Sequence, residues 1–254
     1  MYKNAFTCGI PNSKEVGNVF AAALGYVAGN PDKGLESLAN VTPADNVIAQ
    51  RLIDEGKITV ALSGISSRIF IEATLETRES KVILTIRDTH TNITKVVVNG
   101  ETVLENIPET EEAGTAKIHS IHRYTLADLV DYVNTVPLEE IEFVKEAYKV
   151  NLDLFEEALK NPRTTFARQL LAMNGGEVIS KDEQMTASLL CNATIEARVI
   201  GLDKPAMSIT GSGAHGIIAT MPLYGVFKIH GLSEEMLYRA TMLSYLICTC
   251  LLYT

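Results

Sequence analysis

The sequence contains no tryptophan, only four cysteines and no excess of basic residues. Its 22 lysines and arginines are outnumbered by 31 aspartates and glutamates, which gives a net charge of −9 at pH 7. Nucleic acids and anionic membrane surfaces both require a basic face on the protein that binds them. The acidic balance therefore predicts neither a nucleic-acid partner nor a membrane partner.

Long hydrophobic runs are also absent. The most apolar run, Met242–Tyr253, is shorter than the roughly 20 residues that a membrane-spanning helix needs. The first segment, Met1–Asn12, has no apolar stretch of the length found in secretory signals. Both observations predict a cytoplasmic protein.

The four cysteines form no C-x-x-C pair. In the cytoplasm they are expected to stay reduced. Cys248 and Cys250 lie two positions apart on an expected helix, so they point about 200° apart around its axis and cannot share a metal ion there. We expect this pair, Cys8 and Cys191 to behave as small apolar residues, and we predict no metal site.

What the sequence does contain is a region of period-2 alternation. Between Lys57 and Leu104 apolar and polar residues alternate, and Asn99-Gly100 is a strong hairpin signal. The strands are too closely spaced for crossover helices, which indicates an antiparallel meander. The expected strands are Lys57–Leu62, Arg68–Glu76, Lys81–Asp88, Ile93–Val98 and Glu101–Leu104.

Helical patterns lie on both sides of this region. Prolines at first-turn positions and capping residues mark where they begin. The expected helices are Glu15–Ala28, Pro31–Ala39, Pro43–Glu55, a helix from Thr125 to before Pro137, Pro137–Lys160, Ser180–Gly201 and a last helix from Ser233. The sequence thus predicts an α+β fold: an antiparallel β-meander sheet flanked by N-terminal helices and a C-terminal helical bundle. We expect residues 1–115 to form the α+β domain and residues 116–254 the helical domain.

The stretch Ser208–Gly225 contains three glycines in six residues, Gly211, Gly213 and Gly216, before it becomes apolar and helical. A glycine turn that runs into a helix leaves backbone N–H groups free to bind a small anion. Side-chain donors from the same stretch would add to such a site: Ser208, Thr210, Ser212 and His215.

Two other interpretations of this stretch stay open. The letters fit the dinucleotide pattern G-x-G-x-x-G, but that pattern requires a strand before it, whereas a helical pattern precedes it here and Pro222 is expected to interrupt the helix after it. The glycines could also serve only the close packing of a tight turn between two helices. A ligand site is our preferred interpretation.

Several motifs, in order along the chain, resemble one enzyme family. They are Lys3-Asn4 with Gly9-Ile10-Pro11, Ala21-Ala22-Ala23-Leu24-Gly25 with Gly29-Asn30 and Gly34-Leu35-Glu36, His90-Thr91-Asn92-Ile93, and Gly211-Ser212-Gly213 with Gly216-Ile217 and Ala219-Thr220-Met221-Pro222. Together they are similar to the iron–sulfur-dependent L-serine dehydratase alpha chains, most closely the L-cysteine desulfidase-like branch.

The resemblance implies a lyase that converts L-serine or L-cysteine to pyruvate and ammonia, with sulfide released from cysteine. Family members use a 4Fe–4S cluster whose open iron acts as a Lewis acid. This chain departs from the family in two ways: the family's Gly-Cys-Thr-Glu-Pro motif is missing, and Ala214-His215 replaces an Asn-Gln pair. Three thiolates must converge on such a cluster, so we expect no complete cluster in this chain alone.

The resemblance also suggests site residues. His90 and His215 are the catalytic candidates, and the substrate-binding candidates are Lys3, Asn4, Thr91, Asn92, Ser208, Thr210, Gly211, Ser212 and Gly213. We predict that His90–Asn92 and the glycine turn line one cleft, with Cα atoms within about 20 Å of one another.

Two hypotheses about function follow. The chain is either a lyase subunit for a small β-substituted amino acid, incomplete or inactive by itself, or a catalytically silent homologue that binds a small anionic ligand or a partner chain. The end of the last helix, Leu246–Thr254, lacks a capping residue, and its apolar residues face all directions. We therefore expect a chain truncated at both ends, whose last helix is covered by a partner chain or a second copy in a homo-oligomer.

Overall fold

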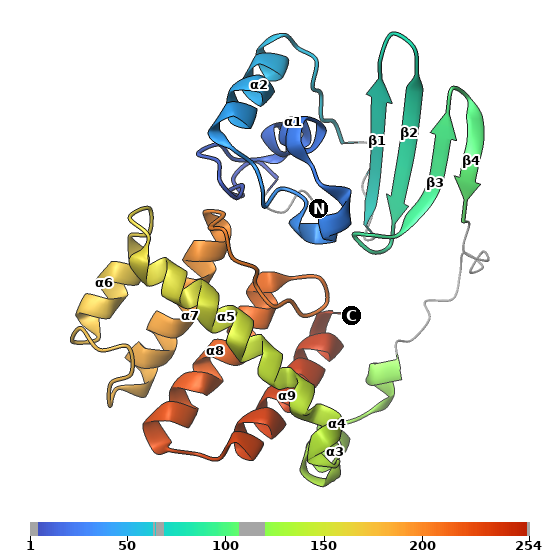
Figure 1. Cartoon of the computed structure of the whole chain (residues 1–254). Coiled ribbons are helices and arrows are strands. Elements are labelled where there is room, and N and C mark those ends of the chain that lie inside the picture. Colours follow the sequence, from blue (N-terminus) through green and yellow to red (C-terminus); the bar gives the residue numbers. More distant parts are fainter. Residues whose placement is uncertain (1–4, 63, 65–68, 107–119, 253–254) are drawn as a thin grey trace.

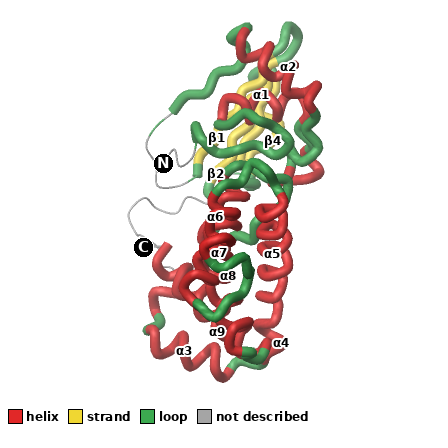
Figure 2. Tube along the Cα trace, turned by 90° about the vertical axis from the view of Figure 1, so that its left-hand side faces the viewer, coloured by secondary structure: helices red, strands yellow, loops and turns green. Residues whose placement is uncertain are grey.

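A computed structural model describes residues 5–62, 64, 69–106 and 120–252 of the chain (Figure 1). The predicted α+β class is confirmed, with an antiparallel sheet between two groups of helices. The tube view shows the sheet with α1 and α2 at one end of an elongated molecule and the later helices at the other (Figure 2). The division at residue 115 stays a prediction.

The first group of helices consists of α1 (Asn18–Ala28), the 3-10 helix η1 (Pro31–Glu36) and α2 (Pro43–Asp54). Thr42 and Asp45 form a reciprocal capping box at the start of α2, where the sequence predicts a helix to begin. The small core of this group contains Ile10, Phe20, Ala23, Leu24, Val41 and Ala49.

The sheet has the order β1-β2-β3-β4 with antiparallel neighbours. Its strands are β1 (Phe70–Glu76), β2 (Lys81–Arg87), β3 (Ile93–Val98) and β4 (Glu101–Glu105). Asn99 and Gly100 have φ values of 52° and 87°, so the predicted hairpin turn is confirmed. The prediction of a strand at Lys57–Leu62 is wrong, because this segment pairs with no described strand.

The second group begins with η2 (Ser120–Arg123) and α3 (Leu126–Thr135), whose Thr125 and Asp128 form the second capping box. The remaining helices are α4 (Leu138–Ile141), η3 (Glu142–Val144), α5 (Lys145–Lys160), α6 (Phe166–Met173), α7 (Glu183–Val199), α8 (Gly213–His230) and α9 (Glu234–Leu252). Their core lies where α5, α7 and α8 meet. No helix among the described residues is long and apolar enough to span a bilayer.

Two expectations for these helices are corrected by the structure. Pro222 does not interrupt α8, which continues to His230. Proline removes one helical hydrogen bond, to the carbonyl of Ile218, and the Ile218 residue is exposed to water. The N-cap of α7 is Asp182 rather than Ser180, since its carboxylate accepts a hydrogen bond of 2.9 Å from Met185 N–H.

Helix α6 was not predicted, because its cap comes from a distant part of the chain. Thr165, the N-cap residue, makes no capping bond of its own. Instead the Glu196 carboxylate, from α7, accepts hydrogen bonds from the N–H groups of Thr165 (2.7 Å), Phe166 (3.0 Å) and Ala167 (2.9 Å). Helix α6 can therefore begin without a capping residue of its own, so its start leaves no local signal in the sequence.

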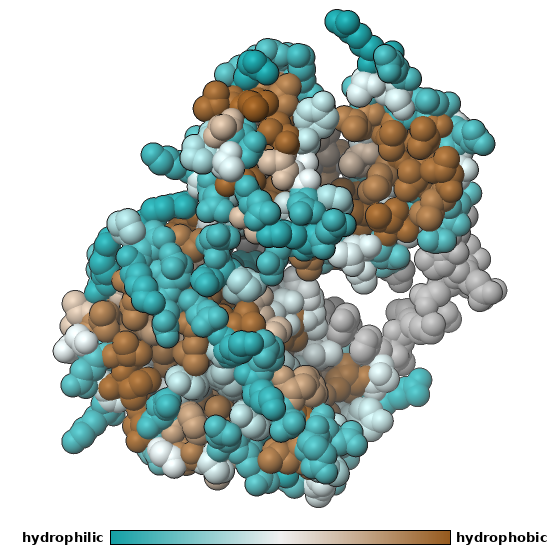
Figure 3. All heavy atoms as spheres, viewed as in Figure 1, coloured by the Kyte–Doolittle hydropathy of each residue, from teal (hydrophilic) through white to brown (hydrophobic). Residues whose placement is uncertain are grey.

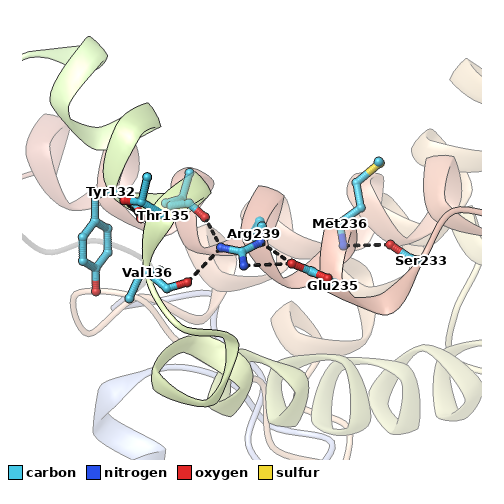
Figure 4. Close-up of polar contacts among 8 residues, drawn as sticks. Tyr132, Thr135, Val136, Ser233, Glu235, Met236 and Arg239 are labelled. Carbon is cyan, nitrogen blue, oxygen red and sulfur yellow. Dashed lines mark hydrogen bonds and ion pairs between the residues drawn. The ribbon is translucent and has the colours of Figure 1, made fainter.

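Polar anchors fix the ends of other elements. Arg239 of α9 donates to the carbonyls of Val133 (2.6 Å) and Val136 (3.1 Å) at the end of α3 and pairs with Glu235 one turn earlier (Figure 4). A cation at a helix C-terminus satisfies carbonyls that have no partner within the helix.

The amino-terminal segment docks directly on the end of α7. Gly9 N–H donates to the Val199 carbonyl over 2.8 Å. A Cβ atom at Gly9 would overlap the Ile200 backbone, and one at Gly201 would overlap Gly9. Glycine is thus required on both sides of this contact, which ties the two halves of the molecule together.

Candidate functional site

The turn before α8 is a tight hairpin of residues 209–212. Ile209 and Ser212 exchange both backbone hydrogen bonds, at 3.2 and 2.9 Å. Thr210 and Gly211 between them have φ values of 53° and 79°, the combination of a type I′ turn. Positive φ is unfavourable for a β-branched residue, so Thr210 holds a strained backbone conformation at this point.

Helix α8 begins immediately after this turn. The Ser212 hydroxyl caps it by accepting from His215 N–H. Within the described residues, the N–H groups of Gly213 and Ala214, the first two of the helix, have no acceptor. Two free N–H groups at the positive end of an 18-residue helix favour an anion.

His90 lies against this turn. A Cβ atom built on Gly211 would stand 3.2 Å from Cε1 and 3.6 Å from Nδ1 of the His90 ring. The β2–β3 turn that carries His90 forms the end of the sheet nearest the second group of helices (Figure 1). The predicted proximity of the two stretches, 121 positions apart in numbering, is therefore confirmed, and the cleft that they were expected to line stays a prediction.

Arg198, in the last turn of α7, approaches the same helix start. A Cβ atom on Gly213 would stand 2.7 Å from Nε and 3.2 Å from Cδ of Arg198. The arginine is half-buried, and within the described part of the chain its guanidinium group forms no hydrogen bond or ion pair, although its backbone carbonyl accepts from Gly201 N–H. No motif in the sequence pointed to Arg198. The Arg198 side chain thus packs against Gly213, the first residue of α8.

His215 faces inward from the first turn of α8. Its Nδ1 atom is buried and has no hydrogen-bond partner among the described residues. A buried polar atom without a partner is costly and needs an explanation.

A buried hydrogen-bond network holds the segment before the turn. Asn151 is fully buried on α5; its Oδ1 accepts from Met207 N–H at 3.0 Å and its Nδ2 donates to Thr220 Oγ1 at 3.0 Å. Thr220 in turn donates to the Gly216 carbonyl. A Cβ atom on Gly216 would overlap the Met207 carbonyl, so this glycine serves packing rather than binding.

Comparison with known proteins gives a consistent result over almost the whole chain. A family profile described as "Serine dehydratase alpha chain" matches residues 32–252. The chain belongs to this serine dehydratase alpha-chain family. No solved structure matches it.

Family relatives include a protein named "UPF0597 protein" from Shewanella baltica, 34% identical over 252 residues. Proteins of the same family name from Clostridium botulinum and Yersinia enterocolitica are 34% identical over 254 and 250 residues. In each case 97% of this chain is covered, but only 57–58% of the relative. The chain therefore spans somewhat more than half the length of these relatives. Membership of the family supports a lyase-like role.

Three of the remaining predicted site residues lie in the described part of the chain: Ser208, Thr91 and Asn92. Ser208 and Thr91 are exposed. The Asn92 amide donates to the Arg87 carbonyl over 3.1 Å and so closes the β2–β3 turn. Lys3 and Asn4 lie outside the described residues. The predicted roles of all these residues stay predictions.

The residues of the described chain do not fit the family's iron–sulfur cluster. All four cysteines are free thiols. No group of three His, Cys, Asp or Glu side chains in the described ranges comes close enough to hold a metal ion. Burial also raises the pKa of the Cys191 thiol, which disfavours the thiolate that a cluster requires.

Proposed function

We propose that this chain binds a small β-substituted L-amino acid, L-serine or L-cysteine, at the start of α8 and takes part in its β-elimination to pyruvate and ammonia. Family membership supports the lyase class. The observation that supports the location is the contact between the His90 ring and Gly211, because it joins the two family-like motifs at one exposed place.

The substrate carboxylate has a suitable partner set in this arrangement. The Gly213 and Ala214 N–H groups belong to the first turn of α8, and the Arg198 side chain lies against Gly213. Charge-assisted hydrogen bonds of this kind contribute about 1.5–3 kcal/mol each. Together they would fix the amino acid by the one group that both candidate substrates share.

The proton chemistry is assigned to the two histidines. In β-elimination the Cα–H bond and the bond from Cβ to oxygen or sulfur break, and a Cα–Cβ double bond forms. We assign His90 as the base that takes the Cα proton and His215 as the group that orients the substrate. The proton that His90 takes from Cα passes to the leaving group, which departs as water or hydrogen sulfide, and the aminoacrylate tautomerises and is hydrolysed by water to pyruvate and ammonia.

A calorimetric titration tests the binding part of this proposal. L-Serine and L-cysteine should bind, whereas ethanolamine, which lacks the carboxylate, should not. Arg198→Gln should weaken binding roughly 10–100-fold, the equivalent of about 1.5–3 kcal/mol. The matched control is Arg51→Gln, because Arg51 lies on α2 and is 69% exposed. Equal binding of ethanolamine and L-serine would contradict the proposal.

A second candidate function is binding without turnover. It is favoured by the absence of a cysteine group that fits a cluster in the described part of the chain. A pyruvate assay on anaerobically prepared protein separates the two functions. Binding with pyruvate formation supports the lyase, and binding without it supports the silent homologue.

A further inference from the structure

The two faces of the sheet differ sharply in chemistry. Strand pairing places the acidic and basic residues of the sheet on one face, in pairs such as Glu76 with Lys81 and Lys95 with Glu105. The other face consists of aliphatic residues from all four strands, in cross-strand pairs such as Ile71 with Ile86. Its one charged position is Glu101, beside the β3–β4 turn.

This aliphatic face is not covered by the described part of the chain. Ile71 is 44% exposed, Leu75 45%, Ile93 40% and Leu104 37%. None of the residues of this face belongs to either hydrophobic core, and no described helix packs extensively on the sheet. The space-filling view shows it as a continuous hydrophobic area over β1–β4 (Figure 3).

Its extent exceeds that of scattered surface hydrophobics. Four strands about 4.8 Å apart, with about six residues of about 3.3 Å each, form a face of roughly 400 Å² before side-chain relief is included. An apolar patch of this size is as large as the largest one on a typical monomer, and such patches are often functional. A half-buried antiparallel sheet normally buries such a face against another layer.

We propose that this face packs against the same face of a second copy of the chain, to form a two-fold symmetric sheet-on-sheet dimer. Two aliphatic sheet faces pack about 10 Å apart with their strands within about 30° of each other. A two-fold axis brings identical patches together, so an aliphatic patch is complementary to its own copy.

Charge favours a second copy over a charged partner. Each copy has a net charge of −9, so two copies repel each other overall, and a contact between them is least unfavourable where both facing surfaces carry almost no charge. The aliphatic face meets this condition, and it has almost no charged group with which a basic or acidic partner could form an ion pair. Pairing through the sheet edges is disfavoured, because both edge strands are acidic: Glu72 and Glu76 lie on β1, Glu101 and Glu105 on β4.

The surface area that the two faces would bury indicates how stable this dimer is. With side-chain relief the face amounts to roughly 500 Å² per copy, or roughly 1,000 Å² for the pair, the lower end of specific interfaces. The dimer should therefore be reversible and should dissociate on dilution through the micromolar range.

Sedimentation velocity of the 1–254 chain from 1 to 200 µM tests this proposal. Leu75→Lys and Ile71→Lys place a charge in each copy of the interface and should each raise the dimer dissociation constant at least about tenfold. Both positions are already exposed in the single chain, so the fold should tolerate lysine there. The matched control is Thr74→Lys, on the same strand but on the opposite face.

Circular dichroism and urea unfolding establish that each variant is folded. Dimerisation that is lost in the two aliphatic-face variants and kept in Thr74→Lys supports the proposal. A monomer over the whole concentration range would overturn it. Equal loss in Thr74→Lys and Leu75→Lys would also overturn it, since the face would then not matter.

Discussion

Replacing Asn151 with alanine tests how the glycine turn is held in place. Asn151 is fully buried and connects the Met207 backbone to Thr220 of α8. Without it, Met207 N–H loses its acceptor, at a cost of about 1–3 kcal/mol. Thr220 Oγ1 keeps its own bond to the Gly216 carbonyl, so little is lost there.

The lost packing adds about 1 kcal/mol, so the free energy of unfolding should fall by roughly 2–4 kcal/mol in total. For a chain of this size the melting temperature should fall by about 4–16 °C. Urea unfolding and calorimetry measure the two quantities.

The control for this prediction is Asn192→Ala. Asn192 is an exposed residue on α7 whose amide donates to Ser188, one turn away. Its replacement should change stability by no more than about 0.5 kcal/mol. If Asn151→Ala destabilised the protein no more than Asn192→Ala, the network would not hold the turn.

Three further predictions concern other contacts. The pKa of the Glu196 carboxyl is lowered although burial acts to raise it, because N–H groups at the start of α6 donate to it. The contribution of this carboxylate to the free energy of unfolding should be complete above its ordinary pKa of 4.5 and should be lost as pH falls through its lower pKa in the folded protein. Urea unfolding at several pH values should show that Glu196→Gln removes this pH dependence. Arg239→Met leaves the α3 carbonyls without their donor and should lower the free energy of unfolding by about 1–3 kcal/mol, measured in the same way. In Gly211→Ala the new methyl group is unfavourable at a φ of 79° and would stand 3.2 Å from the His90 ring. This substitution should weaken L-serine binding at least about tenfold in a titration.

The parts of the fold that depend on local signals could be predicted from the sequence. The capping boxes at Thr42 and Thr125 and the hairpin at Asn99-Gly100 are examples, because each is built from residues within four positions of one another. The strand expected at Lys57–Leu62 failed because a strand also needs a neighbour, and alternation alone does not supply one.

The candidate site was only partly predictable for the same reason. The glycine turn and the His90 motif were found because their letters resemble a family, and the structure brings them together. Arg198 was missed because its relation to Gly213 depends on how α7 and α8 pack, which no spacing rule expresses. Helix α6 was missed because its cap, Glu196, lies about 30 positions away from the helix start.

The measurement that tests the central claim most directly is a backbone amide NMR titration of the chain with L-serine. The claim is that the amino acid places its carboxylate at the start of α8. We predict the largest shift changes at the amides of Gly211, Gly213 and Ala214, and their loss in Arg198→Gln. Changes confined to another place, such as the apolar hollow of about 330 Å³ beside Val19 and Leu62, or no changes at all, would contradict it.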